Sequence, residues 1–344
     1  MRGAFAIILP DRFIPVLLAT VVLAILFPLS GRALEVIGYV SIVAIVALFF
    51  VHGARLSRQA VRRSFLQFRL HLVIIAFTFL AFPLIGLGLT EIAAPFIGPE
   101  FTPGALFLCA LPTTVASSIA MVSIARGNVA ASVVAAAVSN MLGVVMTPLM
   151  FALMLSTSGA PMGLGGIGKV ILMLALPFAI GQLFRPAVGT WVESRPGLSR
   201  TLDRVTILLA IYTALSAAVG SGLFDDIGVA QFALLLAAML TLLALVIGAA
   251  MLAGRLLGFD YGDRTALLFA AMQKSVISGT PMARILFPGA EAGLIIMPLL
   301  VYYIPMQTIS AIIAARMGVT APGEPPSEPL QFAEDDQLDH EQNR

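Results

Sequence analysis

Long runs of apolar residues separated by short polar stretches make up most of the chain. A helix needs about 20 predominantly apolar residues to cross the hydrocarbon core of a bilayer. Ten runs approach or exceed that length, and they predict membrane-spanning helices at residues 13–30, 36–53, 70–90, 104–124, 129–154, 167–184, 203–222, 229–256, 264–285 and 293–316. The pattern therefore predicts an all-α polytopic membrane protein whose surroundings are a lipid bilayer.

Positive charges alternate between the two sides of this predicted bundle. Five arginines lie in the second connection, from Arg55 to Arg69, whereas the odd-numbered connections carry only Arg32, Lys169 and Arg284. Because lysine and arginine concentrate in cytoplasmic loops, this distribution predicts that both termini are cytoplasmic and that the number of spans is even. No cleavable signal peptide is expected, so the first helix remains as an anchor. We expect an integral protein of a bacterial inner membrane.

Composition excludes several other classes of protein. Hydrophobic residues make up 59% of the 344 residues and charged residues 11%, against about 25% charged in soluble domains. A single cysteine, Cys109, excludes an internal disulfide and is expected to be a packing residue, and no clustered Cys or His predicts a metal site. No catalytic constellation is visible, so neither an enzyme nor a cofactor is expected. The excess of basic residues fits loops facing anionic lipid, and no nucleic-acid partner is predicted.

The chain divides into two halves of five predicted spans around the glycine-rich connection Ser156–Gly166. An odd number of spans in each half forces the halves, 1–155 and 156–319, to be repeats of inverted orientation. Beyond them, residues 320–344 are rich in proline and acidic side chains. That composition predicts a disordered cytoplasmic tail.

The fourth span of each half is interrupted by helix-breaking residues. In the first half Pro112 lies beside four hydroxyl side chains, Thr113, Thr114, Ser117 and Ser118. In the second half the breakers Gly279 and Pro281 lie near the polar residues Gln273, Lys274, Ser275 and Ser278. At membrane depth, free backbone groups are tolerated only inside the protein or beside a cavity. These spans are therefore expected to be broken helices that cross near the midplane; the alternative is a pair of packing kinks that bind no ligand.

Several further polar residues lie in neighbouring spans. Ser132, Ser139 and Asn140 in the fifth span and Gln307 in the tenth either line the same cavity or serve as contacts between helices. His52 and His71 flank the arginine-rich connection, where interfacial or loop contacts are expected in preference to a proton relay.

Lys274 is the candidate functional residue with the clearest physical argument. No aspartate or glutamate lies in the interior of the predicted spans to pair with it. It lies roughly ten residues from either end of its span, about 15 Å at helical rise, which is too far for the side chain to reach the interface. A charge at that depth is expected to face a water-filled cavity, a polar site or a bound anion. The alternative is a structural lysine paired with backbone carbonyls or side-chain oxygens.

Segments along the chain also carry a family resemblance. They are Phe50-Val-His-Gly-Ala-Arg-Leu-Ser, Phe68-Arg-Leu-His-Leu, Phe77-Thr-Phe-Leu-Ala-Phe-Pro-Leu-Ile-Gly-Leu, Leu111-Pro-Thr-Thr-Val-Ala-Ser-Ser-Ile-Ala, Ile124-Ala-Arg-Gly-Asn-Val-Ala-Ala, Ser139-Asn-Met-Leu-Gly-Val-Val-Met-Thr-Pro-Leu and Gln273-Lys-Ser with Pro281-Met-Ala-Arg-Ile-Leu-Phe-Pro. Over about residues 10–318 the chain resembles the bile acid:sodium symporter family, in its divergent branch with the seventh vertebrate paralogue and bacterial relatives. The resemblance implies two inverted five-helix repeats, a panel domain of spans 1, 2, 6 and 7, a core domain of the others, and cotransport of sodium with organic anions.

The resemblance also implies where sodium would bind. Ser118 and Ser132 match two hydroxyl ligands. Ile119 takes the place of an asparagine ligand, Ala136 replaces a further hydroxyl, and Lys274 appears in the segment where a glutamate is expected. A fixed ammonium 4 Å from a cation would oppose its binding by about 4 kcal/mol at an effective dielectric of 20.

Together these residues favour a secondary-active transporter of small organic anions that works by alternating access. Lys274 would replace the coupling cation, either as a fixed charge holding the crossing helices together or as a group that releases a proton in each cycle. The coupling ion is left open between Na⁺, H⁺ and none. The alternative function is a non-transporting membrane regulator or scaffold whose acidic tail docks cytosolic partners.

Overall fold

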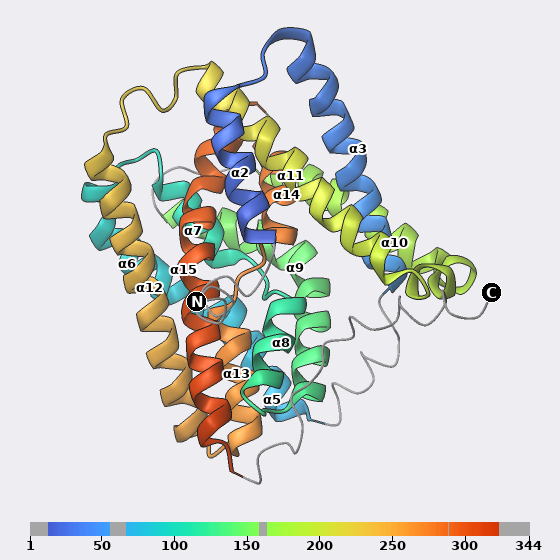
Figure 1. The fold of residues 1–344 in the computed structure, drawn as a ribbon, viewed down its shortest axis with the longest axis vertical. Helices are drawn as coiled ribbons and strands as arrows, with labels where there is room; N and C mark the ends of the chain where they lie inside the picture. The colour runs from blue at the N-terminus through green and yellow to red at the C-terminus, as the bar shows by residue number, and fades with distance from the viewer. Residues whose placement is uncertain (1–12, 56–66, 158–163, 288, 323–344) are drawn as a thin grey trace, which may run out of the picture.

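The computed structural model describes residues 13–55, 67–157, 164–287 and 289–322, and every regular element in these ranges is helical (Figure 1). In chain order the elements are α2 (Phe13–Leu26), α3 (Gly31–Arg55), α5 (Phe68–Ala76), the π-helical turn η1 (Phe77–Ala81), α6 (Phe82–Ile97), α7 (Thr102–Ala110), α8 (Ala116–Ile124), α9 (Val129–Thr157), α10 (Leu164–Glu193), α11 (Pro196–Gly220), α12 (Val229–Leu256), α13 (Tyr261–Met272), α14 (Val276–Leu286) and α15 (Glu291–Thr320). The prediction of an all-α polytopic membrane protein is confirmed.

Seven helical segments among the described residues are long and apolar enough to cross a membrane: Gly31–Arg55, Phe68–Ile97, Val129–Ser156, Leu172–Glu193, Pro196–Gly220, Val229–Leu256 and Glu291–Thr320. The other three predicted spans correspond to α2, whose described part has 14 residues, and to the interrupted pairs α7–α8 and α13–α14. The count of ten crossings stays a prediction.

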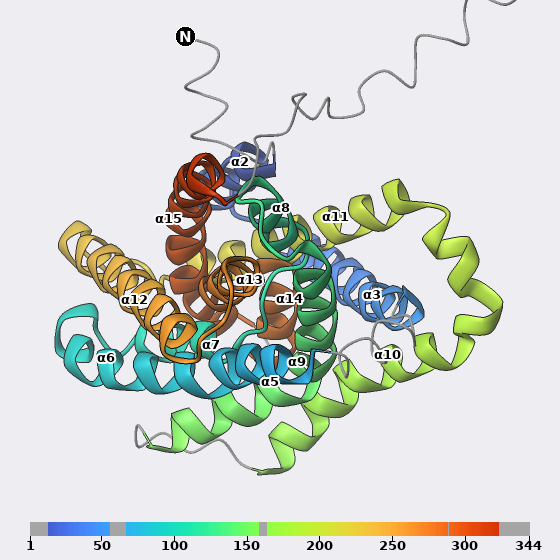
Figure 2. The same ribbon diagram turned by 90° about the horizontal axis from the view of Figure 1, so that it is seen from below.

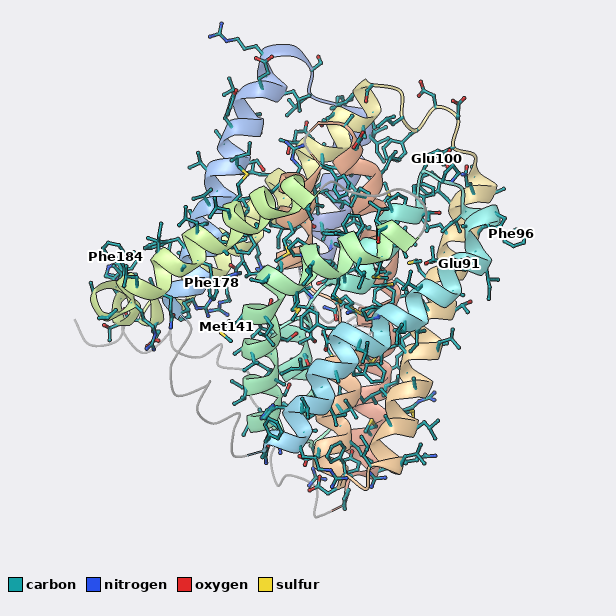
Figure 3. All side chains as sticks on the ribbon, turned by 180° about the vertical axis from the view of Figure 1, so that it is seen from behind. Glu91, Phe96, Glu100, Met141, Phe178 and Phe184 are labelled. Atoms are coloured by element: carbon teal, nitrogen blue, oxygen red, sulfur yellow. The ribbon has the colours of Figure 1, made fainter. Side chains whose placement is uncertain are left out.

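The outer surface of the helices is apolar, as contact with lipid requires. Phe184 of α10 and Phe96 of α6 project outward on opposite sides of the molecule and are 52% and 60% exposed (Figure 3). Exposing such large apolar side chains to water is unfavourable, whereas contact with lipid tails carries no such cost.

Helices α2, α3, α10 and α11 pack together on one side of the molecule (Figure 1). Gly53 of α3 and Gly181 of α10 let the two backbones touch, because a Cβ on Gly53 would collide with the carbonyl of Phe178 and one on Gly181 with the carbonyl of Phe50. Small residues at helix contacts are the usual basis of close packing in membranes, where no hydrophobic effect draws helices together. Helix α10 bends along its length and contains two internal prolines, Pro177 and Pro186 (Figure 2).

Some predicted boundaries differ from the structure. The span predicted at 70–90 contains the π-helical turn η1, which the apolar pattern does not reveal, and α15 continues to Thr320 at the start of the predicted tail. Residues 323–344, most of that tail, lie outside the described residues. The division into inverted repeats at 1–155 and 156–319 stays a prediction.

Candidate functional site

The first interruption, between α7 and α8, contains Pro112 as predicted. Side chains of α9 satisfy the backbone groups that the missing helical turn leaves free. The Thr113 N–H donates to Ser139 Oγ at 3.2 Å, and Asn140 Nδ2 donates to the Thr113 carbonyl at 2.8 Å. Thr147 Oγ1 donates to the Ala110 carbonyl at 2.9 Å. The extended segment is therefore stabilised by protein hydrogen bonds, which backbone at membrane depth requires.

The second interruption lies at Gln273–Ser275, which corrects the predicted breaks at Gly279 and Pro281. Ser275 caps α14, with its hydroxyl accepting from the Ser278 N–H at 3.1 Å, so the helix begins before either predicted breaker. The Gly279 N–H then donates to the Ser275 carbonyl at 2.9 Å within the helix, and Pro281 lies inside α14, where it removes one donor without ending the helix. The serine cap was the sequence signal for the true position.

The two interruptions contact each other. The Ser275 N–H donates to the Pro112 carbonyl at 3.0 Å. The side-chain oxygen of Gln273 accepts from Thr114 Oγ1 at 2.6 Å and from Ser117 Oγ at 2.5 Å. The polar residues of the two predicted breaks are thus brought together, although they are about 160 positions apart in the chain.

Lys274 lies between the interruptions and is 1% exposed. Its ammonium nitrogen donates to three backbone carbonyls, those of Leu111 at 2.7 Å, Cys109 at 3.1 Å and Thr78 at 3.3 Å. It also lies 3.9 Å from the centre of the Phe82 ring, within range of a cation–π interaction. Among the described residues no carboxylate pairs with it. These surroundings match the alternative of a lysine paired with backbone carbonyls.

Each of the three carbonyls is free for a structural reason. In η1 the Phe82 N–H donates to the Phe77 carbonyl instead of to Thr78, and the next residue, Pro83, has no N–H to offer. Cys109 and Leu111 lie at the C-terminal end of α7, where carbonyls lack helical partners and the helix dipole favours a cation. Lys274 therefore acts as a C-terminal cap for α7 and joins it to the π-helical turn.

A cavity of about 640 Å³ lies beside the interruptions, between α3, α10 and α11 on one side and α8, α9 and α14 on the other. Apolar side chains such as Phe49, Met141, Phe178 and Met282 form most of its wall. Met141 of α9 and Phe178 of α10 are labelled in Figure 3. Three residues predicted as site residues, Asn140, Ser275 and Ser278, also line it, and Lys274 is not among the lining residues.

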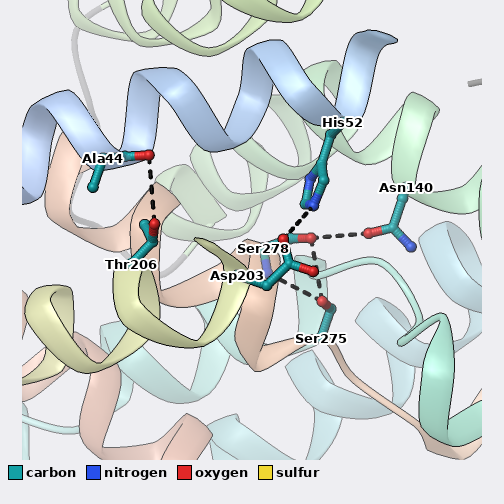
Figure 4. Close-up of polar contacts among 7 residues, drawn as sticks. All are labelled: Ala44, His52, Asn140, Asp203, Thr206, Ser275 and Ser278. Carbon is teal, nitrogen blue, oxygen red and sulfur yellow. Dashed lines mark hydrogen bonds and ion pairs between the residues drawn. The ribbon is translucent and has the colours of Figure 1, made fainter. Parts of the chain in front are cut away.

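The charged part of the cavity wall comes from α3 and α11. His52 Nε2 lies 3.1 Å from Asp203 Oδ1 (Figure 4). On the same cavity, the Ser278 hydroxyl donates to Asn140 Oδ1 at 2.9 Å. Arg55 and Arg200 complete this side. His52 thus pairs with an acid on a neighbouring helix, whereas interfacial contacts were expected.

The sequence alone does not single out Arg55, Arg200 or Asp203 as site residues. Membrane topology alone accounts for arginines in these connections, and Asp203 stands at the first position of the predicted span 203–222. Because α11 begins at Pro196, this aspartate lies two turns inside the helix and faces the cavity. The missed signal was an acid at the very start of a predicted span, three residues after Arg200.

The remaining predicted site residues lie elsewhere in the core. Gln307 of α15 donates to the Tyr303 hydroxyl at 3.2 Å and does not line the cavity. Ser118 and Ser132 are buried, and within the described ranges their hydroxyls have no hydrogen-bond partner. These two hydroxyls are free to coordinate a small cation, but within the described residues no group of three His, Cys, Asp or Glu could hold a metal ion.

Comparison with known proteins links this architecture to membrane transport. The model of the SBF-like CPA transporter family matches residues 11–318. An uncharacterized protein of Pseudomonas aeruginosa is 42% identical over 309 residues, 90% of this chain and 93% of that protein. YfeH of Escherichia coli K12, a proposed symporter, is 37% identical over 306 residues, 89% and 92% of the two chains. Sodium/bile acid cotransporter 7 of Mus musculus is 28% identical over 282 residues, 78% and 80%.

Proposed function

The chain belongs to the SBF-like CPA transporter family, and from this we propose that it is a secondary-active transporter of small organic anions that works by alternating access. The names of two relatives, a proposed symporter and a sodium/bile acid cotransporter, support cotransport of a solute. The proposed substrate site is the cavity beside the two helix interruptions.

The observation that carries this proposal is the composition of the cavity wall. Its volume of about 640 Å³ suits a small organic molecule, and its walls are mainly apolar. Arg55 and Arg200 face it without an acidic partner among the described residues. A guanidinium binds a carboxylate or sulfonate through two parallel hydrogen bonds, so the wall fits a ligand with one anionic group and an apolar body.

We further propose that transport does not require sodium. The ammonium group of Lys274 lies between the interruptions and donates to the Cys109 and Leu111 carbonyls at the end of α7, a role that a bound cation would otherwise fill. A second cation within a few Å would meet repulsion of about 4 kcal/mol at 4 Å and an effective dielectric near 20. Ser118 and Ser132 offer hydroxyl oxygens without the carboxylate that hard cations usually bind.

The proposed domain arrangement follows the same logic. Helices α2, α3, α10 and α11 form a panel, and the other helices form a core that carries both interruptions. The interrupted pairs α7–α8 and α13–α14 hold corresponding places in the two halves of the chain, which supports inverted repeats. With both termini cytoplasmic, the cavity would open toward the cytoplasm, because Arg55 and Arg200 stand at that end of their helices.

The test uses purified protein and matched pairs of ligands. Benzenesulfonate and taurocholate should raise the melting temperature, whereas benzenesulfonamide, a neutral analogue of the first, should not. The shift should be equal in sodium and potassium chloride, and Arg200→Gln should reduce it. Uptake of radiolabelled benzenesulfonate or taurocholate into proteoliposomes then tests transport. Equal responses to the anion and its neutral analogue, without uptake, would refute anion transport; a shift that needs sodium would refute sodium independence.

A further inference from the structure

The cavity wall contains a titratable pair placed where water and ligand meet. The side chains of His52 and Asp203 are 25% and 14% exposed. Their contact, 3.1 Å between His52 Nε2 and Asp203 Oδ1, links α3 to α11. Because an ionised carboxylate can only accept, the hydrogen in this contact belongs to His52 Nε2. The lone pair of neutral His52 is then on Nδ1, which is the atom that takes up a proton.

The other charged groups on the wall set the electrostatic conditions. Arg55 lies on α3 and Arg200 on α11, while the lining residues from α8, α9, α10 and α14 are uncharged. Two arginines against one aspartate leave one positive charge when His52 is neutral, and protonation of His52 raises it to two. The Asp203 carboxylate lies directly against the imidazole on which that additional charge would reside.

We propose that the His52–Asp203 pair is the proton-coupling site of the transporter. His52 Nδ1 binds one proton when an organic anion occupies the cavity and releases it when the anion leaves. This inference rests on the proposed function and identifies its coupling ion. Each ligand favours binding of the other, because the anion's charge offsets the charge that the proton adds. For a monoanion, the complete cycle moves no net charge.

The site differs from Lys274 in the property that proton exchange requires. The hydrogens of the Lys274 ammonium are engaged by three carbonyls, and the residue is 1% exposed. His52 instead lines the cavity, as do Asn140 of α9 and Ser278 of α14 (Figure 4). Histidine is also the side chain whose charge changes most readily between pH 5 and 8.

The test measures binding of benzenesulfonate at pH 5.5 and pH 8.0. A sulfonate stays ionised at both pH values, so any pH dependence originates in the protein. Wild-type protein should bind at least tenfold more tightly at pH 5.5, and His52→Gln and Asp203→Asn should remove that difference. Thr206→Val is the matched control: Thr206 donates to the Ala44 carbonyl across the same α3–α11 contact at 3.4 Å, and valine loosens it without removing a titratable group. This control should keep the full pH dependence.

Two further measurements use only the wild-type protein, so their results do not depend on whether a variant folds. Addition of benzenesulfonate in weak buffer at pH 7.5 should take up close to one proton for each anion bound. Uptake into proteoliposomes should follow an inward proton gradient and should not respond to a potassium–valinomycin potential.

The outcomes separate the two proposals. If benzenesulfonate and taurocholate fail to bind at either pH and are not taken up, the proposed function fails and the proton site with it. If they bind equally at both pH values without proton uptake, or if His52→Gln keeps the pH dependence, the proton site fails and anion transport stands. Loss of the pH dependence in Thr206→Val would assign the effect to helix contact and would also overturn the proton site.

Discussion

Replacement of Lys274 with methionine tests whether its ammonium group holds the two interruptions together. Methionine is similar in length but donates no hydrogen bond, so the carbonyls of Thr78, Cys109 and Leu111 lose their shared donor. A buried polar group left unsatisfied costs about 1–3 kcal/mol. We take the low end, on the order of 3 kcal/mol for the three, because the variant also recovers the desolvation cost of a buried charge. At about 2–4 °C for each kcal/mol, the melting temperature should fall by roughly 6–12 °C.

The single cysteine of the chain provides a local assay for this variant. Cys109 is fully buried, and its carbonyl is one of the three that Lys274 binds. A fluorogenic maleimide should therefore label it slowly in the folded wild-type protein and about tenfold faster in Lys274→Met, because opening of the end of α7 exposes the thiol. The control is Lys169→Met, at the other lysine of the chain, located on α10. It should match wild type in both measurements.

One result would refute the structural argument. If Lys274→Met melts within 1 °C of wild type and its cysteine reacts no faster, the three hydrogen bonds contribute nothing to stability, and the role assigned to the ammonium is wrong. Unchanged sodium-independent uptake of benzenesulfonate by the variant would further show that transport does not need this charge.

Other substitutions test separate parts of the structure. Arg200→Gln should weaken benzenesulfonate binding about tenfold, the loss of roughly one charge-assisted hydrogen bond of 1.4 kcal/mol, measured by titration calorimetry; unchanged affinity would contradict its role in anion binding. Gly181→Ala should destabilise the protein by about 1–3 kcal/mol, because the new Cβ overlaps the backbone of α3, whereas Gly168→Ala on the same helix has open space and should be neutral in thermal melts. Burial raises the pKa of Tyr261 above its ordinary value of 10.0, so its contribution to stability is present below pH 10 and is lost as the pH rises further. The melting temperature of wild type should therefore fall more steeply above pH 10 than that of Tyr261→Phe, and parallel curves would contradict this account.

The sequence identified the interruptions more reliably than their boundaries. Pro112 lies in the first break because a proline has no backbone N–H to donate and hydroxyl-bearing residues follow it. Both are local properties of the sequence. In the second half, the pattern predicts the break at Gly279 and Pro281, whereas Ser275 caps the helix first and places both inside α14. A helix tolerates such residues when an earlier cap and close packing determine where it starts, and single-sequence patterns do not reveal which signal prevails.

The cavity shows what local patterns could not indicate. Its lining comes from six helices and both interruptions, and its charged residues were assigned to topology because each is ordinary in its own segment. Asp203 acquires a functional context only when α11 packs against α3 and places it beside His52. Contacts between segments 151 positions apart cannot be read from either segment alone.

The sequence by itself determined that this is an all-helical membrane protein with interrupted spans and a lysine that has no neighbouring acid. The length of an apolar run, the position of a proline and the charges near a lysine can all be read from the local sequence. Tertiary structure alone decided what that lysine binds. The carbonyl of Thr78 is free because of a π-helical turn before Pro83, and those of Cys109 and Leu111 because α7 ends there. Packing of distant helices brings these three acceptors to one ammonium group, since backbone groups away from water must find their partners within the protein.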